Sequence, residues 1–220
     1  MTLTPIKTPL VVKKMFPNYI WDIATNEKTI FLTFDDGPTP EITNWVLHTL
    51  KAYNAKATFF CIGNNIEKYP EIFQNILKEG HAIGNHTHNH IKGWKTKAND
   101  YVDNIVQAQN IIRNQIQNSE IDNRQSLIVN RFRPPYGQIT PKQGKKLLAL
   151  GYKIIMWDVL SFDWDKNVSE ATCFNNVVSK ATHGSIIVFH DSVKASKNMY
   201  YALPKVLEHF RKQGFSFQAL

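Results

Sequence analysis

Short runs of apolar, β-branched and aromatic residues alternate along the chain with longer stretches in which apolar residues recur every three or four positions. The short runs are typical of buried strands, and the periodic stretches are typical of helices with one apolar face. The predicted strands cover residues 29–34, 57–62, 81–84, 131–133, 152–157, 185–189 and 215–217. The predicted helices cover residues 39–53, 70–79, 99–117, 140–150 and 199–212. Strands and helices that alternate in this way predict a parallel sheet, and this many units predict an α/β barrel or a strongly curved sheet.

Capping residues mark several of these boundaries. Thr-Pro pairs at residues 39–40 and 140–141 supply an N-cap hydroxyl followed by a proline in the first helical turn. Gly80 and Gly151 follow predicted helix ends, where glycine tolerates the left-handed conformation that stops a helix. The polar residues 118–125 are predicted to form a surface loop.

Length and composition predict one domain. The chain has 220 residues, of which 43% are apolar, and this is enough for one hydrophobic core. We expect a single domain over residues 1–220, with residues 1–27 as an N-terminal extension. The formal net charge is +8, but the lysines are scattered, and no predicted helix has the dense basic stripe of a nucleic-acid-binding protein. We therefore expect no nucleic-acid partner.

The cysteines and the N-terminal sequence bear on location. Cys61 and Cys173 lie among apolar residues and are expected to be buried thiols rather than a disulfide. The aliphatic run at residues 10–12 is too short for a secretory signal, and no stretch reaches transmembrane length. As written, the sequence predicts a soluble cytoplasmic protein without membrane insertion; a chain trimmed of its leader would look the same and act outside the cytoplasm.

Side chains suited to chemistry follow the predicted strands. They form five segments, at residues 35–37, 86–90, 133–137, 158–164 and 190–191. In a parallel barrel the carboxyl ends of all strands meet at one face, which is where active sites are built. We therefore expect these five segments to converge on one pocket.

Two of the segments have the composition of a hydrolytic metal site. His86 and His90 are four residues apart and can aim both rings at one ion, although such pairs also occur on plain surfaces. Asp35 and Asp36 are adjacent, so their side chains diverge, and one can bind the metal while the other faces the bound water. Without the histidines the same residues would indicate an ordinary turn. His88 would point away from its neighbours and is expected to be solvated or structural.

Two further pairings are expected. Arg133 is costly to bury without a carboxylate, and a bidentate contact with Asp35 would keep that aspartate ionised and aimed. His190 ends an apolar strand, where a lone histidine is usually a satisfied core residue. Asp163 offers it a carboxylate that would stabilise the imidazolium and make His190 a general acid.

In their order along the chain, these segments resemble the motifs of the polysaccharide deacetylases of the NodB-homology type, carbohydrate esterase family 4. The five motifs are Thr33-Phe-Asp-Asp-Gly37, His86-Thr-His-Asn-His90, Arg133-Pro-Pro-Tyr-Gly137, Asp163-Trp164 and Val188-Phe-His190. The similarity covers residues 29–217 and implies a distorted (β/α) barrel of about seven strands.

The resemblance implies a metal centre. Asp36, His86 and His90 would bind one divalent ion, with zinc expected and cobalt, nickel or manganese as alternatives because the same ligands accept them. Asp35 would be the general base, with Arg133 as its partner. Together these residues would attack the acetyl carbonyl with an activated water.

The resemblance also implies which residues of the protein surround the acetyl group of the substrate. His190 would be the general acid, tuned by Asp163, and the backbone N–H of Tyr136 would help to hold the oxyanion. The pocket for the acetyl group would be lined by Pro134, Trp164 and Val188.

The implied function is removal of N-acetyl groups, with release of acetate, from glycans that contain N-acetylglucosamine, either peptidoglycan or chitin-like oligosaccharides. The alternatives are an O-acetyl esterase acting on xylan and a catalytically silent glycan-binding protein on the same fold.

The chain departs from the family pattern in the fourth motif. That motif often has an aspartate where this chain has Leu160, with Asp158 nearby instead. Trp94 would either stack on a sugar or pack locally. The exact glycan and the oligomeric state stay open.

Overall fold

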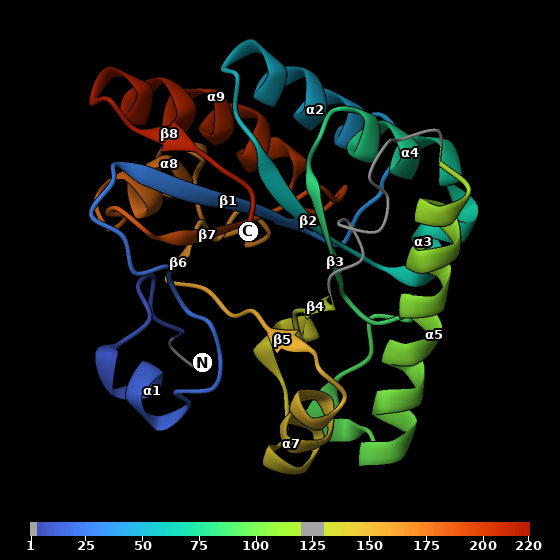
Figure 1. Cartoon of the computed structure of the whole chain (residues 1–220). Helices are drawn as coiled ribbons and strands as arrows, with labels where there is room; N and C mark the ends of the chain where they lie inside the picture. Colours follow the sequence, from blue (N-terminus) through green and yellow to red (C-terminus); the bar gives the residue numbers. More distant parts are fainter. Residues whose placement is uncertain (1–3, 120–129) are drawn as a thin grey trace.

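The computed structural model describes residues 4–119 and 130–220, which form a curled sheet surrounded by helices (Figure 1). The strands are hydrogen-bonded in the order β5-β4-β3-β2-β1-β7-β6, and β8 pairs with the start of β1. All of these pairings are parallel. The strands are β1 Thr29–Asp35, β2 Ala57–Cys61, β3 Ala82–Asn85, β4 Arg131–Phe132, β5 Lys153–Ile154, β6 Val159–Leu160, β7 Ile186–His190 and β8 Ser216–Phe217. The distorted (β/α) barrel predicted from the sequence is confirmed.

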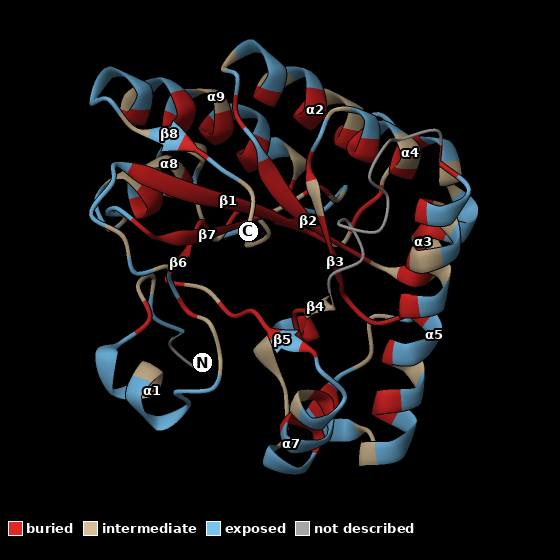
Figure 2. Cartoon of the chain, viewed as in Figure 1, coloured by how far each residue is buried: buried red, intermediate tan, exposed pale blue. Residues whose placement is uncertain are grey.

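Helices cover the outside of the sheet, with buried faces turned inward and exposed faces turned to solvent (Figure 2). The α-helices are α1 Leu10–Met15, α2 Ile42–Ala52, α3 Gly63–Lys68, α4 Pro70–Lys78, α5 Ala98–Gln117, α7 Pro141–Ala149, α8 Glu170–Val178 and α9 Ser196–Lys212, and the 3₁₀ turns are η1 Gly93–Lys95 and η2 Pro135–Gly137. Every residue of β1 and β2 is buried, which explains their nearly continuous apolar sequence. No helix in the described residues is long and apolar enough to cross a membrane.

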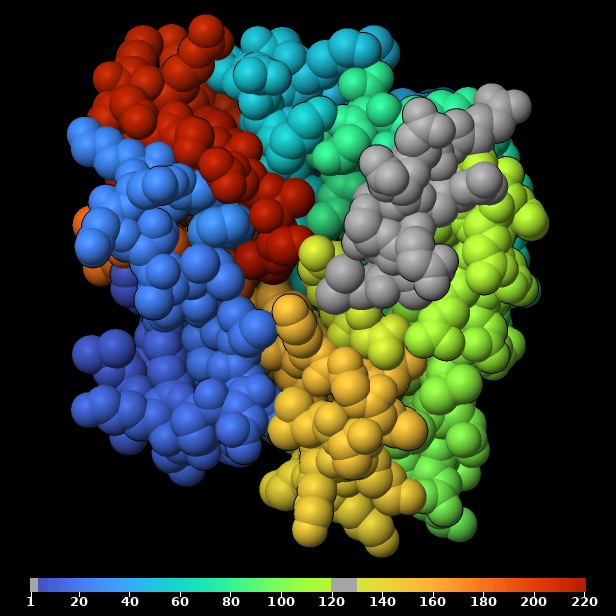
Figure 3. Space-filling model, in the orientation of Figure 1, coloured from blue at the N-terminus to red at the C-terminus, as the bar shows by residue number. Residues whose placement is uncertain are grey.

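The N-terminal segment bridges the gap between the two ends of the sheet. Ile20 pairs with Ile155, directly after β5, and Lys7 pairs with Val159 in β6. The Ile20 N–H donates to the carbonyl of Ile154 at 2.9 Å, and the Thr8 N–H donates to that of Asp158 at 2.8 Å. Figure 3 shows this segment packed beside the residues around position 150. It therefore occupies backbone groups of both edge strands that would otherwise face solvent.

Asp158 fixes the N-terminal segment to the barrel. Its side chain is almost fully buried and accepts bonds from Lys13 at 2.6 Å and from the Ser185 hydroxyl at 2.6 Å. Lys7 lies 3.2 Å from its other oxygen. This buried carboxylate depends on two cations from the N-terminal segment, so its contacts join residues that are more than a hundred positions apart in sequence.

Replacing Asp158 should destabilise the fold. In Asp158→Asn, Lys7 loses its carboxylate partner and Lys13 keeps only Asp22, and we expect the free energy of unfolding to fall by about 3 kcal/mol, the usual cost of breaking a buried ion pair. The exposed pair of Lys51 with Glu79 provides the control, because Lys51→Met should cost less than about 1 kcal/mol. Urea unfolding followed by circular dichroism measures both values. Equal midpoints for the two variants would contradict the anchoring role of Asp158.

Several sequence-based boundaries need correction. Thr39 does not cap α2: the helix begins at Ile42 after Glu41, and the Thr39 N–H instead donates to the Thr43 hydroxyl. The N-cap predicted at Thr140 is confirmed, with a reciprocal bond to residue 143. The predicted strand at 152–157 is shorter because its second half turns toward the N-terminal segment.

Some elements were not predicted, and one prediction falls outside the described residues. The short helices α1 and α3, the helix α8 and the strand β6 were missed. The predicted surface loop at 118–125 lies mostly in residues 120–129, outside the described ranges. The prediction that Cys61 and Cys173 are free and buried is confirmed.

Candidate active site

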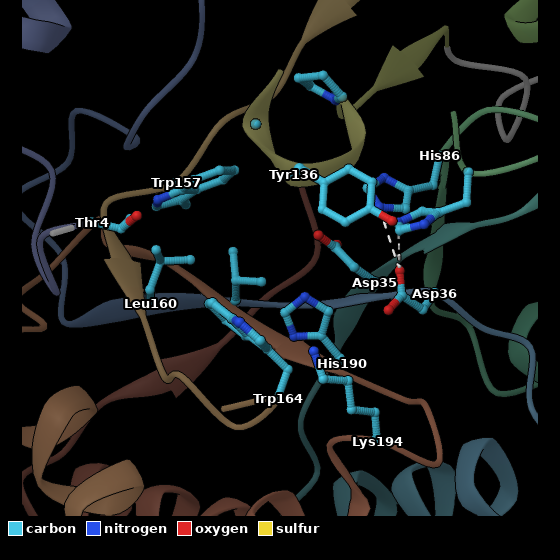
Figure 4. A pocket seen from close by; sticks show the side chains of 14 residues that line it. Thr4, Asp35, Asp36, His86, Tyr136, Trp157, Leu160, Trp164, His190 and Lys194 are labelled. Carbon is cyan, nitrogen blue, oxygen red and sulfur yellow. Dashed lines mark ion pairs between the residues drawn. The ribbon is translucent and has the colours of Figure 1, made fainter. Parts of the chain in front are cut away.

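The carboxyl ends of the strands surround a cavity of about 340 Å³ (Figure 4). Nine of the residues predicted from the sequence line it: Asp35, Asp36, His86, His90, Pro134, Tyr136, Trp164, Val188 and His190. The two other predicted residues, Arg133 and Asp163, lie directly behind this lining and contact it. The expected convergence of the five segments on one pocket is therefore observed.

Asp36, His86 and His90 form a compact cluster at one side of the cavity. Asp36 Oδ1 lies 3.1 Å from His90 Nε2 and 3.6 Å from His86 Nε2. Each of the three residues offers a ligand atom within 4.8 Å of the others. Asp36 and His90 have positive φ angles, 79° and 53°, so the backbone is bent sharply at both positions to turn these side chains inward.

The protonation states suit a cation at this cluster. The Nδ1–H of His86 donates to the Arg133 carbonyl at 2.9 Å, which leaves Nε2 unprotonated toward the cluster. Burial lowers the pKa of His86 to about 4, so the ring is neutral at physiological pH. Burial alone would raise the pKa of Asp36, but the neighbouring rings of His90, His190 and His86 hold it well below its ordinary value.

The donor set fits a divalent ion of the zinc type. Asp36 Oδ1 is buried and has no hydrogen-bond partner in the described residues, although two imidazole nitrogens face it. An orphaned carboxylate oxygen beside two such nitrogens is the arrangement that a bound cation would satisfy. These are the residues expected to hold the metal, and which ion they hold stays a prediction.

Asp35 lies beside this cluster and is held by Arg133. Arg133 is fully buried, and one of its nitrogens, Nη1, donates to Asp35 Oδ1 at 2.8 Å. The prediction of a bidentate contact between Arg133 and Asp35 is wrong, because a single nitrogen of Arg133 reaches the carboxylate. The remaining donors of Arg133 are taken by the Thr33 hydroxyl at 2.6 Å and by the carbonyl of Met156 at 2.8 Å. Within the described chain, Asp35 Oδ2 accepts no side-chain hydrogen bond and so is left for the cavity.

Arg133 also joins three parts of the barrel. Its side chain reaches Thr33 in β1 and the carbonyls of Ile155 and Met156 after β5, and it lies 4.2 Å from the centre of the Phe60 ring. The guanidinium therefore cannot shift without breaking contacts on opposite sides of the sheet, and Asp35 is fixed in position.

His190 and Asp163 form the second expected pair. His190 Nδ1 lies 2.8 Å from Asp163 Oδ1, and the His190 backbone N–H donates to Oδ2 of the same carboxylate at 2.7 Å. Burial would lower the pKa of His190, but the carboxylate of Asp163, together with the charges of Asp36 and Asp35, outweighs burial and raises the pKa to about 9. His190 is therefore protonated at neutral pH, with Nε2–H directed to the cavity that the ring lines.

The rest of the cavity wall is mainly apolar. The Trp164 ring meets His190 edge-on at 4.7 Å between centroids, and Val188 is buried beside it. Figure 4 shows Trp157 and Leu160 on the side of the cavity away from Asp36. This wall is suited to a small apolar group such as a methyl.

Tyr136 closes the cavity beside the Asp36–His86–His90 cluster. Its ring packs on His90 at 4.7 Å between centroids and is about half exposed. Its φ of 59° places it in a strained turn within η2, immediately after β4. The role expected for its backbone N–H stays a prediction.

Five lining residues are not among the predicted site residues: Thr4, Gly137, Trp157, Leu160 and Lys194. Gly137 belongs to the third motif, beside the predicted Tyr136. Thr4 reaches the cavity only because the N-terminal segment bridges the sheet, and no local pattern indicates this. Leu160 lies in β6, a strand that was not predicted, and Trp157 lies just before it. Of these residues, Lys194 could have been expected in the cavity lining from the sequence, because it lies only four residues after His190.

Two predicted residues lie outside the cluster. His88 is buried near Glu67, with 3.7 Å between His88 Nε2 and the carboxylate, and is structural rather than a ligand, as expected. Trp94 lies in η1, and 67% of it is exposed. Its indole N–H donates to the carbonyl of Ile139 at 3.4 Å, so the ring is held at the surface.

Comparison with known families and proteins matches this chain to polysaccharide deacetylases. The polysaccharide deacetylase family model matches residues 22–155. A peptidoglycan-N-acetylglucosamine deacetylase of Bacillus cereus is 36% identical over 204 residues, covering 92% of this chain and 70% of the relative. A chitooligosaccharide deacetylase of Azorhizobium caulinodans is 30% identical, with 90% and 95% of the two chains covered.

Solved structures of carbohydrate deacetylases and of a related pseudoenzyme have a similar fold. A peptidoglycan N-acetylglucosamine deacetylase crystallised with 4-naphthalen-1-yl-N-oxidanyl-benzamide has a TM-score of 0.85 and 33% identity, covering 97% of this chain and 95% of that one. A carbohydrate esterase family 4 pseudoenzyme from Bacillus anthracis, with a TM-score of 0.78 and 22% identity over 91% of this chain and 66% of that one, shares the fold.

Proposed function

Since the chain belongs to the polysaccharide deacetylase family, we propose that it is a metal-dependent hydrolase that removes N-acetyl groups from glycans containing N-acetylglucosamine. Peptidoglycan and chitin-like oligosaccharides are the expected substrates, since relatives with each name are at least 30% identical to this chain. The observation that carries the proposal is one cavity bordered by the Asp36–His86–His90 cluster, the Asp35–Arg133 pair and the His190–Asp163 pair.

Asp36, His86 and His90 would hold the cation. When bound, such an ion supplies Lewis acidity toward the acetamide carbonyl and makes water acidic enough to be deprotonated near neutral pH. The three residues contribute two imidazole nitrogens and one carboxylate oxygen, the ligand chemistry that zinc accepts; cobalt, nickel and manganese are the alternatives.

Asp35 is the group that takes the proton from the attacking water. Its Oδ1 is tied to Arg133, and its Oδ2 is the oxygen left on the cavity side in the described chain. A carboxylate held in this way can accept a proton without first changing its rotamer, because the arginine fixes its orientation.

His190 is the group that gives a proton to the departing amine. Its Nδ1 is occupied by Asp163, so the proton available to substrate is on Nε2. The raised pKa ensures that this proton is present at the start of the reaction. The amine would otherwise leave as an unstable anion.

The apolar wall selects the group to be removed. Trp164, Val188 and Leu160 line the cavity and would contact the acetyl methyl. In this proposal the backbone N–H of Tyr136, in the turn after Pro134, would face the carbonyl oxygen. Such a donor stabilises the negative charge that develops on the carbonyl oxygen.

Acetate release distinguishes this function from O-acetyl esterase activity. Tetra-N-acetylchitotetraose and acetylated xylan are offered separately to the zinc-loaded protein, and acetate is quantified in an enzyme-coupled assay. We expect acetate from the chitotetraose, and none after treatment with a chelator. Release from xylan alone would replace the proposal by the esterase function, and release from neither would favour the silent glycan-binding protein.

A further inference from the structure

The pocket has one cationic side chain that the proposed reaction does not use, Lys194. It lies four residues after His190 and lines the cavity together with His190 and Trp164. Figure 4 shows its ammonium group turned toward these two rings rather than away into solvent. Within residues 4–119 and 130–220, no carboxylate lies within 4.0 Å of Lys194 Nζ.

The loop that carries Lys194 is anchored on both sides. Asp191 is fully buried, its N–H donates to the Asp35 carbonyl at 3.1 Å, and it accepts a bond from the Thr43 hydroxyl at 2.5 Å. Ala195 is also fully buried, and its N–H donates to Ser192. The loop is therefore tied through Asp191 to the backbone of Asp35, and the exposed side chain of Lys194 is free to adapt to a ligand.

The other charges of the pocket already have partners. Asp35 is bonded to Arg133, Asp36 faces the two imidazoles, and His190 is bonded to Asp163. Lys194 is therefore not needed to balance them. An acetamide is neutral, and a chain of N-acetylglucosamine alone carries no anion for an ammonium group to bind. An unpaired cation at the edge of the apolar wall fits a substrate with a carboxylate close to the reacting acetamide.

We propose that Lys194 is a specificity-determining residue that binds a glycan carboxylate next to the reacting acetamide, so that the enzyme prefers acidic N-acetylhexosamine glycans to neutral ones. This inference rests on the proposed function. The lactyl group of N-acetylmuramic acid is a carboxylate of this kind, on carbon 3 of a sugar whose acetamide is on carbon 2. The carboxylate can belong to the reacting sugar or to its neighbour, and the product shows which.

Three tetrasaccharides separate a charge effect from a shape effect. The first is tetra-N-acetylchitotetraose, which is neutral. The second alternates N-acetylglucosamine with N-acetylmuramic acid. The third is the second with its carboxylates reduced to alcohols, so it keeps the shape and loses the charge. Mass spectrometry of the products identifies the sugar that loses its acetyl group.

Three variants are compared with the wild type. Lys194→Met removes the charge and keeps the length of the chain, and Lys194→Arg keeps the charge. Lys197→Met is the matched control, because Lys197 is exposed one turn further along α9 and does not line the cavity. All should fold as the wild type does, since neither lysine has a side-chain partner in the described residues, and thermal melting checks this.

In Lys194→Met we expect kcat/KM on the acidic tetrasaccharide to fall about tenfold through KM, the size of a single lost charge pair in a partly exposed site, with both neutral substrates unaffected. Lys194→Arg should retain most of the activity, and Lys197→Met should match the wild type. An equal loss on all three substrates, no loss on any, or the same loss in Lys197→Met would overturn the inference. A wild type inactive on every substrate would instead overturn the proposed function on which it rests.

Discussion

Asp35→Asn should lower kcat at least about a thousandfold while the protein still binds its metal ion. General-base catalysis typically contributes a factor of about 10² to 10⁴, and an amide at this position cannot take up a proton. The amide oxygen can still accept the bond from Arg133 Nη1, so the buried guanidinium keeps its partner and the site keeps its shape. The expected change is therefore in kcat rather than in stability or in metal content.

Single-turnover and steady-state acetate release, with metal analysis of the same samples, measure this effect. Asp100→Asn is the matched control, since Asp100 is exposed on α5 and does not line the cavity. A variant Asp35→Asn that turns over at the wild-type rate would refute the assignment of Asp35 as general base. A variant that loses both metal and activity would assign Asp35 to metal binding instead.

The second large effect concerns pH. Asp163→Asn removes the nearest carboxylate that raises the pKa of His190 and leaves burial, which lowers the pKa, opposed only by the weaker effects of Asp36 and Asp35. The general acid is active only when protonated, so activity is lost as pH rises through its pKa. The alkaline limb of the kcat profile should therefore move toward acid by at least one pH unit, so that kcat at pH 9 should fall at least about fivefold while kcat at pH 7 changes much less.

Rates measured from pH 6 to pH 10 test this prediction, and His190→Gln separates two explanations. The glutamine variant has no titrating ring, so its residual rate should show no alkaline limb from this group. If Asp163→Asn lowered kcat equally at every pH, Asp163 would only position the ring and would not tune its proton. An unchanged profile would contradict both roles.

The sequence was sufficient to predict the barrel and most of the cavity lining, because these depend on local patterns. The strand β1 is buried along its length, so its apolar run was visible, and Asp35 and Asp36 follow from where that run stops. The parallel arrangement then brings all strand ends to one face. For this reason His86, His90 and His190 could be assigned to one pocket without any knowledge of distances.

The remaining features depend on tertiary contacts that no local pattern encodes. Arg133 contacts Asp35 through one nitrogen, Nη1, which also donates to the Thr33 hydroxyl, because Nε and Nη2 donate to backbone carbonyls after β5. Asp158 looked like a displaced motif residue, yet it is the buried anchor of the N-terminal segment. Thr4 reaches the cavity through the same segment, and both positions are set by pairing across the gap in the sheet.

The proposed reaction requires one divalent ion, which Asp36, His86 and His90 would hold. Titration of the metal-free protein with zinc tests this requirement, with bound metal and acetate release from tetra-N-acetylchitotetraose followed together, for the wild type and for Asp36→Asn. We expect wild-type activity to rise in proportion to bound metal up to one ion per chain, and Asp36→Asn neither to bind zinc tightly nor to release acetate. Full activity in the metal-free wild type, or equal zinc binding by Asp36→Asn, would contradict this requirement.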